Sequence, residues 1–164
     1  MSSLLSTSWP STLAPHLLRL GIQMSTAESC TGGMIAAHCT DVSGSSAWFD
    51  RGFVTYSNAA KTQMLGVPEE LICSEGAVSE SVARAMALGA FYRSQAEVTV
   101  AVTGIAGPTG GSAEKPVGTV WFAWCVSGVV SAEMRQFEGD RAAIRIATVS
   151  HALSGLLDRL PQEI

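Results

Sequence analysis

The spacing of apolar residues along the chain predicts three amphipathic helices. Leucines recur at near-helical spacing over Ser11–Leu20, and Gly21 follows as a C-cap. A second helix begins after Ser81, where apolar side chains recur at the period of a buried stripe. The third runs from Ala142 to about Leu160 with the same period. Each helix therefore has one face that is expected to pack against a core.

Five other segments are rich in β-branched and aromatic residues, and we expect them to be strands. Glu97–Ile105 is an almost continuous β-branched run, which indicates a central strand covered on both faces. The last two segments meet at Ser127-Gly128, which predicts an antiparallel hairpin. The expected strands are Ile22–Glu28, Ala47–Ser57, Glu97–Ile105, Val117–Val126 and Val129–Phe137.

Short helices are expected between the strands. One opens at Thr31-Gly32-Gly33, a second has Asn58 as its cap, and a third starts at Pro68. Because strands and helices alternate, the predicted fold is α/β: a three-layer α/β/α sandwich with a mixed, mostly parallel sheet. No repeat or linker divides the chain, so we expect a loose lead-in at residues 1–10 and a single domain at residues 11–164.

Composition excludes several classes of protein. Of the 164 residues 47% are hydrophobic, which is enough apolar surface for a folded core and excludes disorder. The net charge of −4 leaves no basic footprint for nucleic acid. No apolar run approaches the ~18–20 residues of a membrane span, and the first residues lack the features of a signal peptide. We therefore expect a cytoplasmic protein with no nucleic-acid or membrane partner.

The cysteines indicate a reducing compartment. All four are scattered, with no CxxC pair and no histidine at zinc spacing: Cys30, Cys39, Cys73 and Cys125. This pattern is typical of reduced thiols, and it predicts neither a disulfide framework nor a metal site.

The segment Thr26–Gly33 is the first candidate for chemistry. A strand is expected to end at Glu28, and small residues follow at a predicted helix N-terminus. Free backbone N–H groups there would stabilise an oxyanion beside the hydroxyl of Ser29 or the thiol of Cys30. The alternative is purely structural: Ser29 or Thr31 caps the helix, and the glycines allow close packing.

The segment Phe53–Lys61 is the second candidate. Tyr56 is expected at a strand end, with Lys61 one helical turn into the next element. A helix N-terminus disfavours the ammonium form of lysine, and the neutral amine is the form that acts as a base. Alternatively, both residues are ordinary surface positions. A tyrosine–lysine reductase is disfavoured, because its Tyr-x-x-x-Lys spacing is one residue shorter and no dinucleotide loop precedes Tyr56.

A glycine-rich loop after the expected central strand is the third candidate. Open α/β sheets bind ligands at this end of their strands, and glycines let the backbone approach an anion closely. The spacing fits neither GxGxxG nor a P-loop, so a dinucleotide cofactor is not expected. Arg141 and Arg145 lie four residues apart, and either could bind a phosphate by its guanidinium fork or be a surface charge.

Five motifs in this order resemble the CinA C-terminal-domain family: A-E-S-C-T-G-G, F-V-T-Y-S-N-x-x-K, T-G-I-A-G-P-x-G-G, G-x-V-W and G-D-R-x-x-I-R. Some members of this family carry an additional N-terminal domain. The resemblance runs from about Leu13 to Leu160 and is to the members without that domain. The family's enzymes are nicotinamide-nucleotide amidohydrolases. The resemblance implies an α/β/α homodimer that needs no cofactor and converts nicotinamide mononucleotide to nicotinate mononucleotide and ammonia.

The family's catalytic residues map onto Ser29, Tyr56 and Lys61, with Tyr56 and Lys61 both open as the immediate base. Expected substrate contacts are Thr31, Gly32, Gly33, Thr103, Gly104, Gly107, Gly110, Gly111 and Arg141. Two alternatives remain. Cys30 is the nucleophile in one, and in the other the protein is a non-catalytic nucleotide-binding or competence-associated module.

Overall fold

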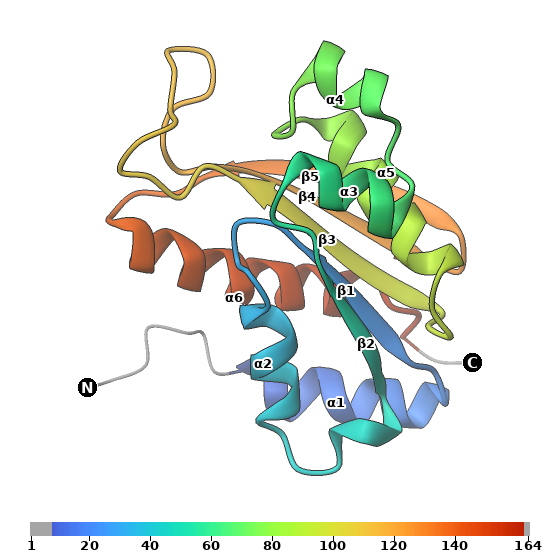
Figure 1. Cartoon of the computed structure of the whole chain (residues 1–164). Coiled ribbons are helices and arrows are strands. Elements are labelled where there is room, and N and C mark those ends of the chain that lie inside the picture. The colour runs from blue at the N-terminus through green and yellow to red at the C-terminus, as the bar shows by residue number, and fades with distance from the viewer. Residues whose placement is uncertain (1–7, 163–164) are drawn as a thin grey trace.

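The computed structural model describes residues 8–162 as alternating helices and strands (Figure 1). In chain order the elements are α1 (Ser8–Leu20), β1 (Met24–Glu28), α2 (Met34–Thr40), the 3₁₀ turn η1 (Ser45–Ala47), β2 (Phe49–Val54), α3 (Asn58–Leu65), α4 (Glu69–Glu75), α5 (Glu80–Tyr92), β3 (Val98–Gly104), β4 (Thr119–Val126), β5 (Val129–Gln136) and α6 (Arg141–Arg159).

The five strands form one mixed sheet in the order β2-β1-β3-β4-β5. Strand β1 pairs in parallel with β2 and β3, whereas β3–β4 and β4–β5 are antiparallel. Four strands therefore run in one direction and β4 runs in the other, which confirms the mixed α/β sheet. The predicted hairpin turn has positive φ at both Ser127 and Gly128, the conformation that matches the twist of two antiparallel strands.

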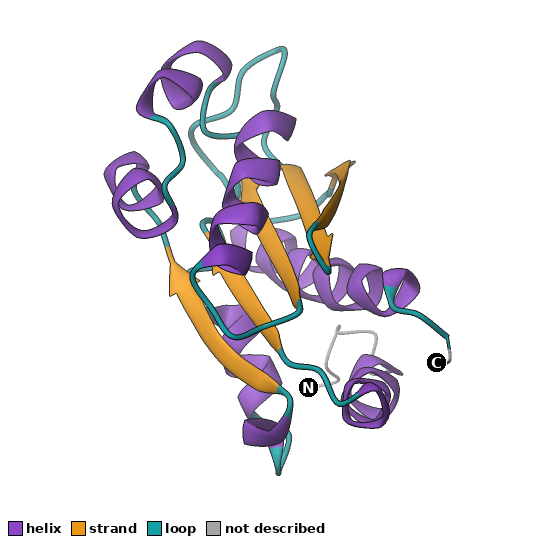
Figure 2. Ribbon diagram, turned by 90° about the vertical axis from the view of Figure 1, so that its right-hand side faces the viewer, coloured by secondary structure: helices purple, strands orange, loops and turns teal. Residues whose placement is uncertain are grey.

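Helices cover both faces of the sheet (Figure 2). On one face α5 packs on β3, β4 and β5 and carries α3 and α4 beside it (Figure 1). On the other face α6 packs on β3 and β4, with α1 and α2 against it. Strand β3 is buried along nearly its whole length between these layers, as its β-branched run predicts. The expected three-layer sandwich is thus present.

Several predicted boundaries are wrong. The lead-in predicted for residues 1–10 overlaps α1, which begins at Ser8 and buries Trp9 to 3% exposure in the core; residues 1–7 lie outside the described part. Strand β2 starts at Phe49 because the preceding residues form η1. The cap of α3 is Ser57 and not Asn58, since Ser57 Oγ accepts a hydrogen bond from the backbone N–H of Ala60.

None of the helices within residues 8–162 is both long enough and apolar enough to span a lipid bilayer.

Candidate active site

The parallel strands bring the predicted residues together at one edge of the sheet. Because β1, β2 and β3 run in the same direction, their carboxyl ends meet, and the long β3–β4 loop leaves the sheet at this edge (Figure 1). A cavity of about 270 Å³ opens there. It is lined by Ser29, Cys30, Tyr56, Asn58, Lys61, Ala77, Val78, Thr103, Gly104, Ala106 and Arg141.

A side-chain contact in this cavity joins Lys61 to Ser29. Lys61 Nζ lies 3.0 Å from Ser29 Oγ, and it also lies 3.1 Å from the carbonyl oxygen of Thr55 and 3.4 Å from that of Tyr56. Ser57 caps α3 shortly after β2 ends at Val54, so Lys61 falls one turn into the helix and its side chain reaches back to the strand end. The serine and the lysine therefore form a hydrogen-bonded pair.

The surroundings of Lys61 favour its neutral form. The residue is only 1% exposed, and burial lowers the pKa of its amine below the usual value of 10.5. Among the described residues it forms no ion pair with a carboxylate. A neutral amine can donate to the two carbonyl oxygens and keep its lone pair for the hydroxyl of Ser29.

Ser29 lies in a turn and not at a helix N-terminus. Strand β1 ends at Glu28, and α2 begins only at Met34, so residues 29–33 form a turn that we call the Ser29 turn. The Ser29 N–H donates to the carbonyl of Val102 at 3.1 Å, which ties the turn to β3. Gly32 and Gly33 both have positive φ, a conformation that glycine adopts without strain.

The predicted use of the α2 N-terminus as an oxyanion site is wrong. The carboxylate of Glu28 accepts hydrogen bonds there from the N–H groups of Ile35 at 2.8 Å and Ala36 at 3.0 Å. Neither Ser29 nor Thr31 caps the helix, since Gly33 occupies the N-cap position and makes no side-chain bond. The free donors of α2 are therefore satisfied from within the protein.

The environment of Cys30 argues against a cysteine nucleophile. Cys30 is buried, and burial raises the pKa of its thiol to about 12. The thiolate is the reactive form of cysteine, so a thiol with this pKa is a poor nucleophile near neutral pH.

Tyr56 and Arg141 meet at the mouth of the cavity. Tyr56 is 60% exposed, and its hydroxyl accepts a hydrogen bond from Arg141 Nη2 at 3.1 Å. Arg141 Nη1 donates in turn to the carbonyl of Gly107 at 2.8 Å. In this geometry the Tyr56 hydroxyl bonds to the arginine, while only its backbone carbonyl contacts Lys61.

Three of the expected substrate contacts line the cavity, namely Thr103, Gly104 and Arg141. Thr103 also fixes one wall, because its hydroxyl donates to the carbonyl of Ala77 at 2.8 Å. Six others do not line it: Thr31, Gly32, Gly33, Gly107, Gly110 and Gly111. Of these, Thr31 is fully buried and its hydroxyl donates to Glu28, and the carbonyl of Gly107 accepts a hydrogen bond from Arg141.

Two charged residues hold the Ser29 turn: sequence reasoning gave no role to Glu28, and it considered Arg145 only as a phosphate ligand or a surface charge. Glu28 bonds to it from the sheet side. Arg145 donates from α6 to the carbonyl oxygens of Cys30 at 3.1 Å and Thr31 at 3.0 Å. Their signals were the glutamate inside A-E-S-C-T-G-G and the four-residue spacing of Arg145 from Arg141.

Comparison with known proteins shows to which family the chain belongs. Residues 7–160 match the model of the CinA C-terminal domain. The chain belongs to the CinA C-terminal domain family. Motif order had suggested this family, and the match confirms it.

Two relatives and one solved structure match this CinA domain over most of their length. It is 59% identical over 145 residues to a Pseudomonas putida protein named nicotinamide-nucleotide amidohydrolase PncC, a match covering 88% of this chain and 91% of the relative. The Escherichia coli K12 protein of the same name is 52% identical, with 87% of each chain covered. The crystal structure of the competence/damage inducible protein CihA from Agrobacterium tumefaciens superposes with a TM-score of 0.87 at 50% identity, covering 96% of this chain and 100% of that one.

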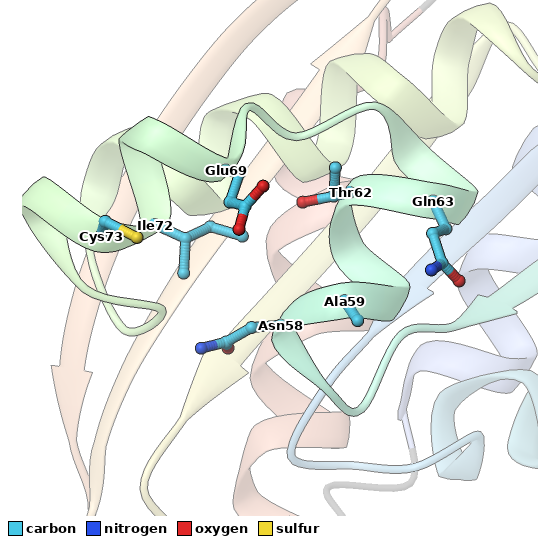
Figure 3. A pocket seen from close by; sticks show the side chains of 7 residues that line it. All are labelled: Asn58, Ala59, Thr62, Gln63, Glu69, Ile72 and Cys73. Atoms are coloured by element: carbon cyan, nitrogen blue, oxygen red, sulfur yellow. The ribbon is translucent and has the colours of Figure 1, made fainter.

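Two hollows adjoin the cavity that Ser29 and Lys61 line. One of about 670 Å³ shares Ala106 and Arg141 with it and is also lined by Arg145. The other, of about 380 Å³, lies between α3 and α4 and shares Asn58 (Figure 3). Only the first presents guanidinium groups, so it is the hollow suited to an anionic part of a ligand. Within residues 8–162, no group of three or more His, Cys, Asp or Glu side chains is placed to hold a metal ion.

Proposed function

We propose that this CinA domain hydrolyses the carboxamide of nicotinamide mononucleotide to nicotinate mononucleotide and ammonia. The observation that carries the proposal is the 3.0 Å contact between Lys61 Nζ and Ser29 Oγ in a cavity. Relatives at 52–59% identity that bear the name nicotinamide-nucleotide amidohydrolase support the reaction class and the substrate. The protein is accordingly an amidohydrolase.

Acylation begins with Lys61 in its neutral form. The amine accepts the proton of Ser29 while Oγ bonds to the carboxamide carbon, which gives a tetrahedral intermediate with a negatively charged oxygen. The backbone N–H of Cys30 is our candidate donor to that oxygen, because it belongs to the residue after the nucleophile and Cys30 lines the cavity. Lys61 is our choice for the immediate base, because its amine contacts Ser29 Oγ whereas the Tyr56 hydroxyl bonds to Arg141.

The intermediate then collapses with loss of ammonia. As the carbon–nitrogen bond breaks, the Lys61 ammonium returns its proton to the departing amine, and the acyl group stays on Ser29 as an ester. A water molecule attacks this ester, and Lys61 takes a proton from the water as it attacks. The carbon–Oγ bond then breaks, the proton passes to Ser29, and nicotinate mononucleotide leaves.

The substrate's position follows from the charges around the cavity. The pyridine ring with its carboxamide is placed beside Ser29, and the ribose phosphate extends into the hollow that Arg141 and Arg145 line. Tyr56 acts at the mouth of the cavity, where its hydroxyl holds Arg141. A guanidinium fork is well suited to a phosphate, so selectivity for the nucleotide over the nucleoside is assigned to Arg141.

We also infer that the protein is a cytoplasmic homodimer. All four cysteines are free, which supports a reducing compartment. Val54, Tyr56 and Met64 expose apolar surface at and beside the edge strand β2, and a second copy of the chain would cover it. Light scattering after size exclusion measures the oligomeric state.

Ammonia release from nicotinamide mononucleotide tests the function. We expect purified protein to release one ammonia per substrate, and Ser29→Ala to lower kcat by at least about 10³-fold. Ser74→Ala is the matched control, because Ser74 is an exposed serine on α4 away from the cavity. Folded wild-type protein that releases no ammonia would favour the non-catalytic binding module.

The same ammonia assay tests whether Cys30 is the nucleophile. Cys30→Ala is expected to retain ammonia release, because the buried thiol stays protonated. Activity retained in Ser29→Ala and lost in Cys30→Ala would make the cysteine the nucleophile.

A further inference from the structure

Glu28 is a buried carboxylate beside the nucleophile that the proposed reaction does not use. It is the last residue of β1, it is fully buried, and Ser29 is its neighbour in the chain. Its side chain accepts hydrogen bonds from Thr31 Oγ1 at 2.6 Å and Thr26 Oγ1 at 3.2 Å, as well as from the N–H groups of Ile35 and Ala36.

The hydrogen bonds around Glu28 suit a carboxylate. All four are donors, two of them backbone amides at the start of α2, where the helix dipole favours a negative charge. A carboxylate has acceptors only, so it satisfies four donors, whereas a neutral acid or an amide would turn a donor toward one of them. The interactions thus offset the cost of burying the charge.

Glu28 also joins three elements around Ser29. Through its backbone it belongs to β1, through Thr31 it holds the Ser29 turn, and through Ile35 and Ala36 it holds α2. Ser29 Oγ depends on this turn for its 3.0 Å contact with Lys61. A displacement of about 1 Å between reacting groups is enough to lower a rate roughly 10²-fold.

We propose that Glu28 is a positioning residue for the nucleophile: its carboxylate, bound to Thr31 and to the first turn of α2, fixes Ser29 Oγ within reach of Lys61. The proposal rests on the proposed function for the role of Ser29. It assigns no proton transfer to Glu28, which touches neither Ser29 Oγ nor Lys61 in its hydrogen bonds.

Two threonines provide a matched pair of variants. Thr26 and Thr31 are both buried, and each donates a hydroxyl to Glu28, but only Thr31 belongs to the Ser29 turn. We expect Thr31→Val to lower kcat by about 10- to 100-fold, with KM changed less than about threefold. Thr26→Val is expected to keep kcat within about threefold at a similar loss of melting temperature.

Glu28→Gln is the direct variant, with an expected fall in kcat at least as large as that of Thr31→Val. The threonine pair decides the question even where Glu28→Gln does not fold. Equal kcat values for Thr26→Val and Thr31→Val at equal melting temperature would overturn the proposal, as would a folded Glu28→Gln protein with the wild-type kcat.

A second readout separates this proposal from the proposed function. The rate at which a fluorophosphonate labels Ser29, followed by intact mass, reports the position of the hydroxyl without the nucleotide substrate. We expect slower labelling in Thr31→Val than in Thr26→Val, with Ser29→Ala as the unlabelled control. That order would support positioning even if wild-type protein released no ammonia, and identical labelling rates would reject it.

Discussion

Lys61 Nζ lies 3.0 Å from Ser29 Oγ, although 32 residues separate them in the chain. Parallel pairing of β1 with β2 creates this contact, because it places the residues that follow the two strands at the same edge of the sheet. The remaining partners of the amine are the carbonyl oxygens of Thr55 and Tyr56. A buried lysine held by uncharged groups is costly for stability and useful for proton transfer.

Replacing Lys61 by methionine is expected to lower kcat without lowering the free energy of unfolding. Methionine keeps an unbranched chain without the amine, so kcat should fall by about 10²- to 10⁴-fold through loss of the base. The free energy of unfolding at pH 7 should not fall, since a desolvated amine is replaced by an apolar group. Ammonia release and urea denaturation measure the two effects.

Lys115→Met is the matched control for this variant, because Lys115 is the only other lysine and it contacts the carbonyl of Glu75 at the surface. We expect its kcat to stay near that of the wild type. Equal losses of kcat in the two lysine variants would contradict a specific role for Lys61.

The pH dependence of kcat should follow the amine of Lys61. Only the neutral amine accepts the Ser29 proton, so activity is expected to rise as pH increases through the pKa of Lys61. Burial lowers this pKa, so the midpoint of the rise should lie below pH 10.5. A kcat profile in overlapping buffers measures the midpoint, and a midpoint at or above pH 10.5 would be inconsistent with a desolvated base.

Stability is linked to the same titration. Between the lowered pKa of folded Lys61 and the unfolded value near 10.5, the unfolded chain binds more protons, so the free energy of unfolding rises with pH in this window. Lys61→Met lacks the titrating group. Any stability advantage it has at neutral pH is thus expected to shrink as the pH approaches 10.5.

Tyr56→Phe distinguishes a proton relay from a contact at the cavity mouth. The tyrosine hydroxyl bonds to Arg141 and not to the serine–lysine pair, so its loss should raise KM by about 2- to 10-fold while kcat changes little. Steady-state kinetics with nicotinamide mononucleotide measure both constants. A fall in kcat as large as that of Lys61→Met would instead assign Tyr56 to proton transfer.

Much of the fold could be predicted from local pattern. The β-branched run at β3 and the Ser127-Gly128 turn specify their own structures, because strand burial and hairpin twist depend on neighbouring residues. The start of α1 was missed because Trp9 is buried by tertiary packing that periodicity does not encode.

The candidate site divides in the same way. Ser29 and Lys61 were predicted from their motifs, and the structure brings them together. Helix capping by Glu28 and the bonds from Arg145 to the Ser29 turn could not be predicted, because each depends on a side chain that reaches across the fold. Glu28 and Ile35 are 7 residues apart in the sequence, and Arg145 and Cys30 are 115 apart, so the local sequence pattern does not predict these contacts.

Gly155 in α6 offers a test of the packing that holds this helix on the sheet. Alanine normally stabilises a helix interior relative to glycine by about 0.5–1 kcal/mol. Here a Cβ would collide with the indole of Trp124, whose ring is stacked on Phe122 and whose Nε1 donates to the carbonyl of Ala152 at 2.9 Å. We therefore expect Gly155→Ala to lower the free energy of unfolding by about 1–3 kcal/mol. Ser154→Ala, one residue earlier and only half-buried, should change it by less than about 0.5 kcal/mol in urea denaturation, and a more stable Gly155→Ala protein would show that α6 shifts freely over Trp124.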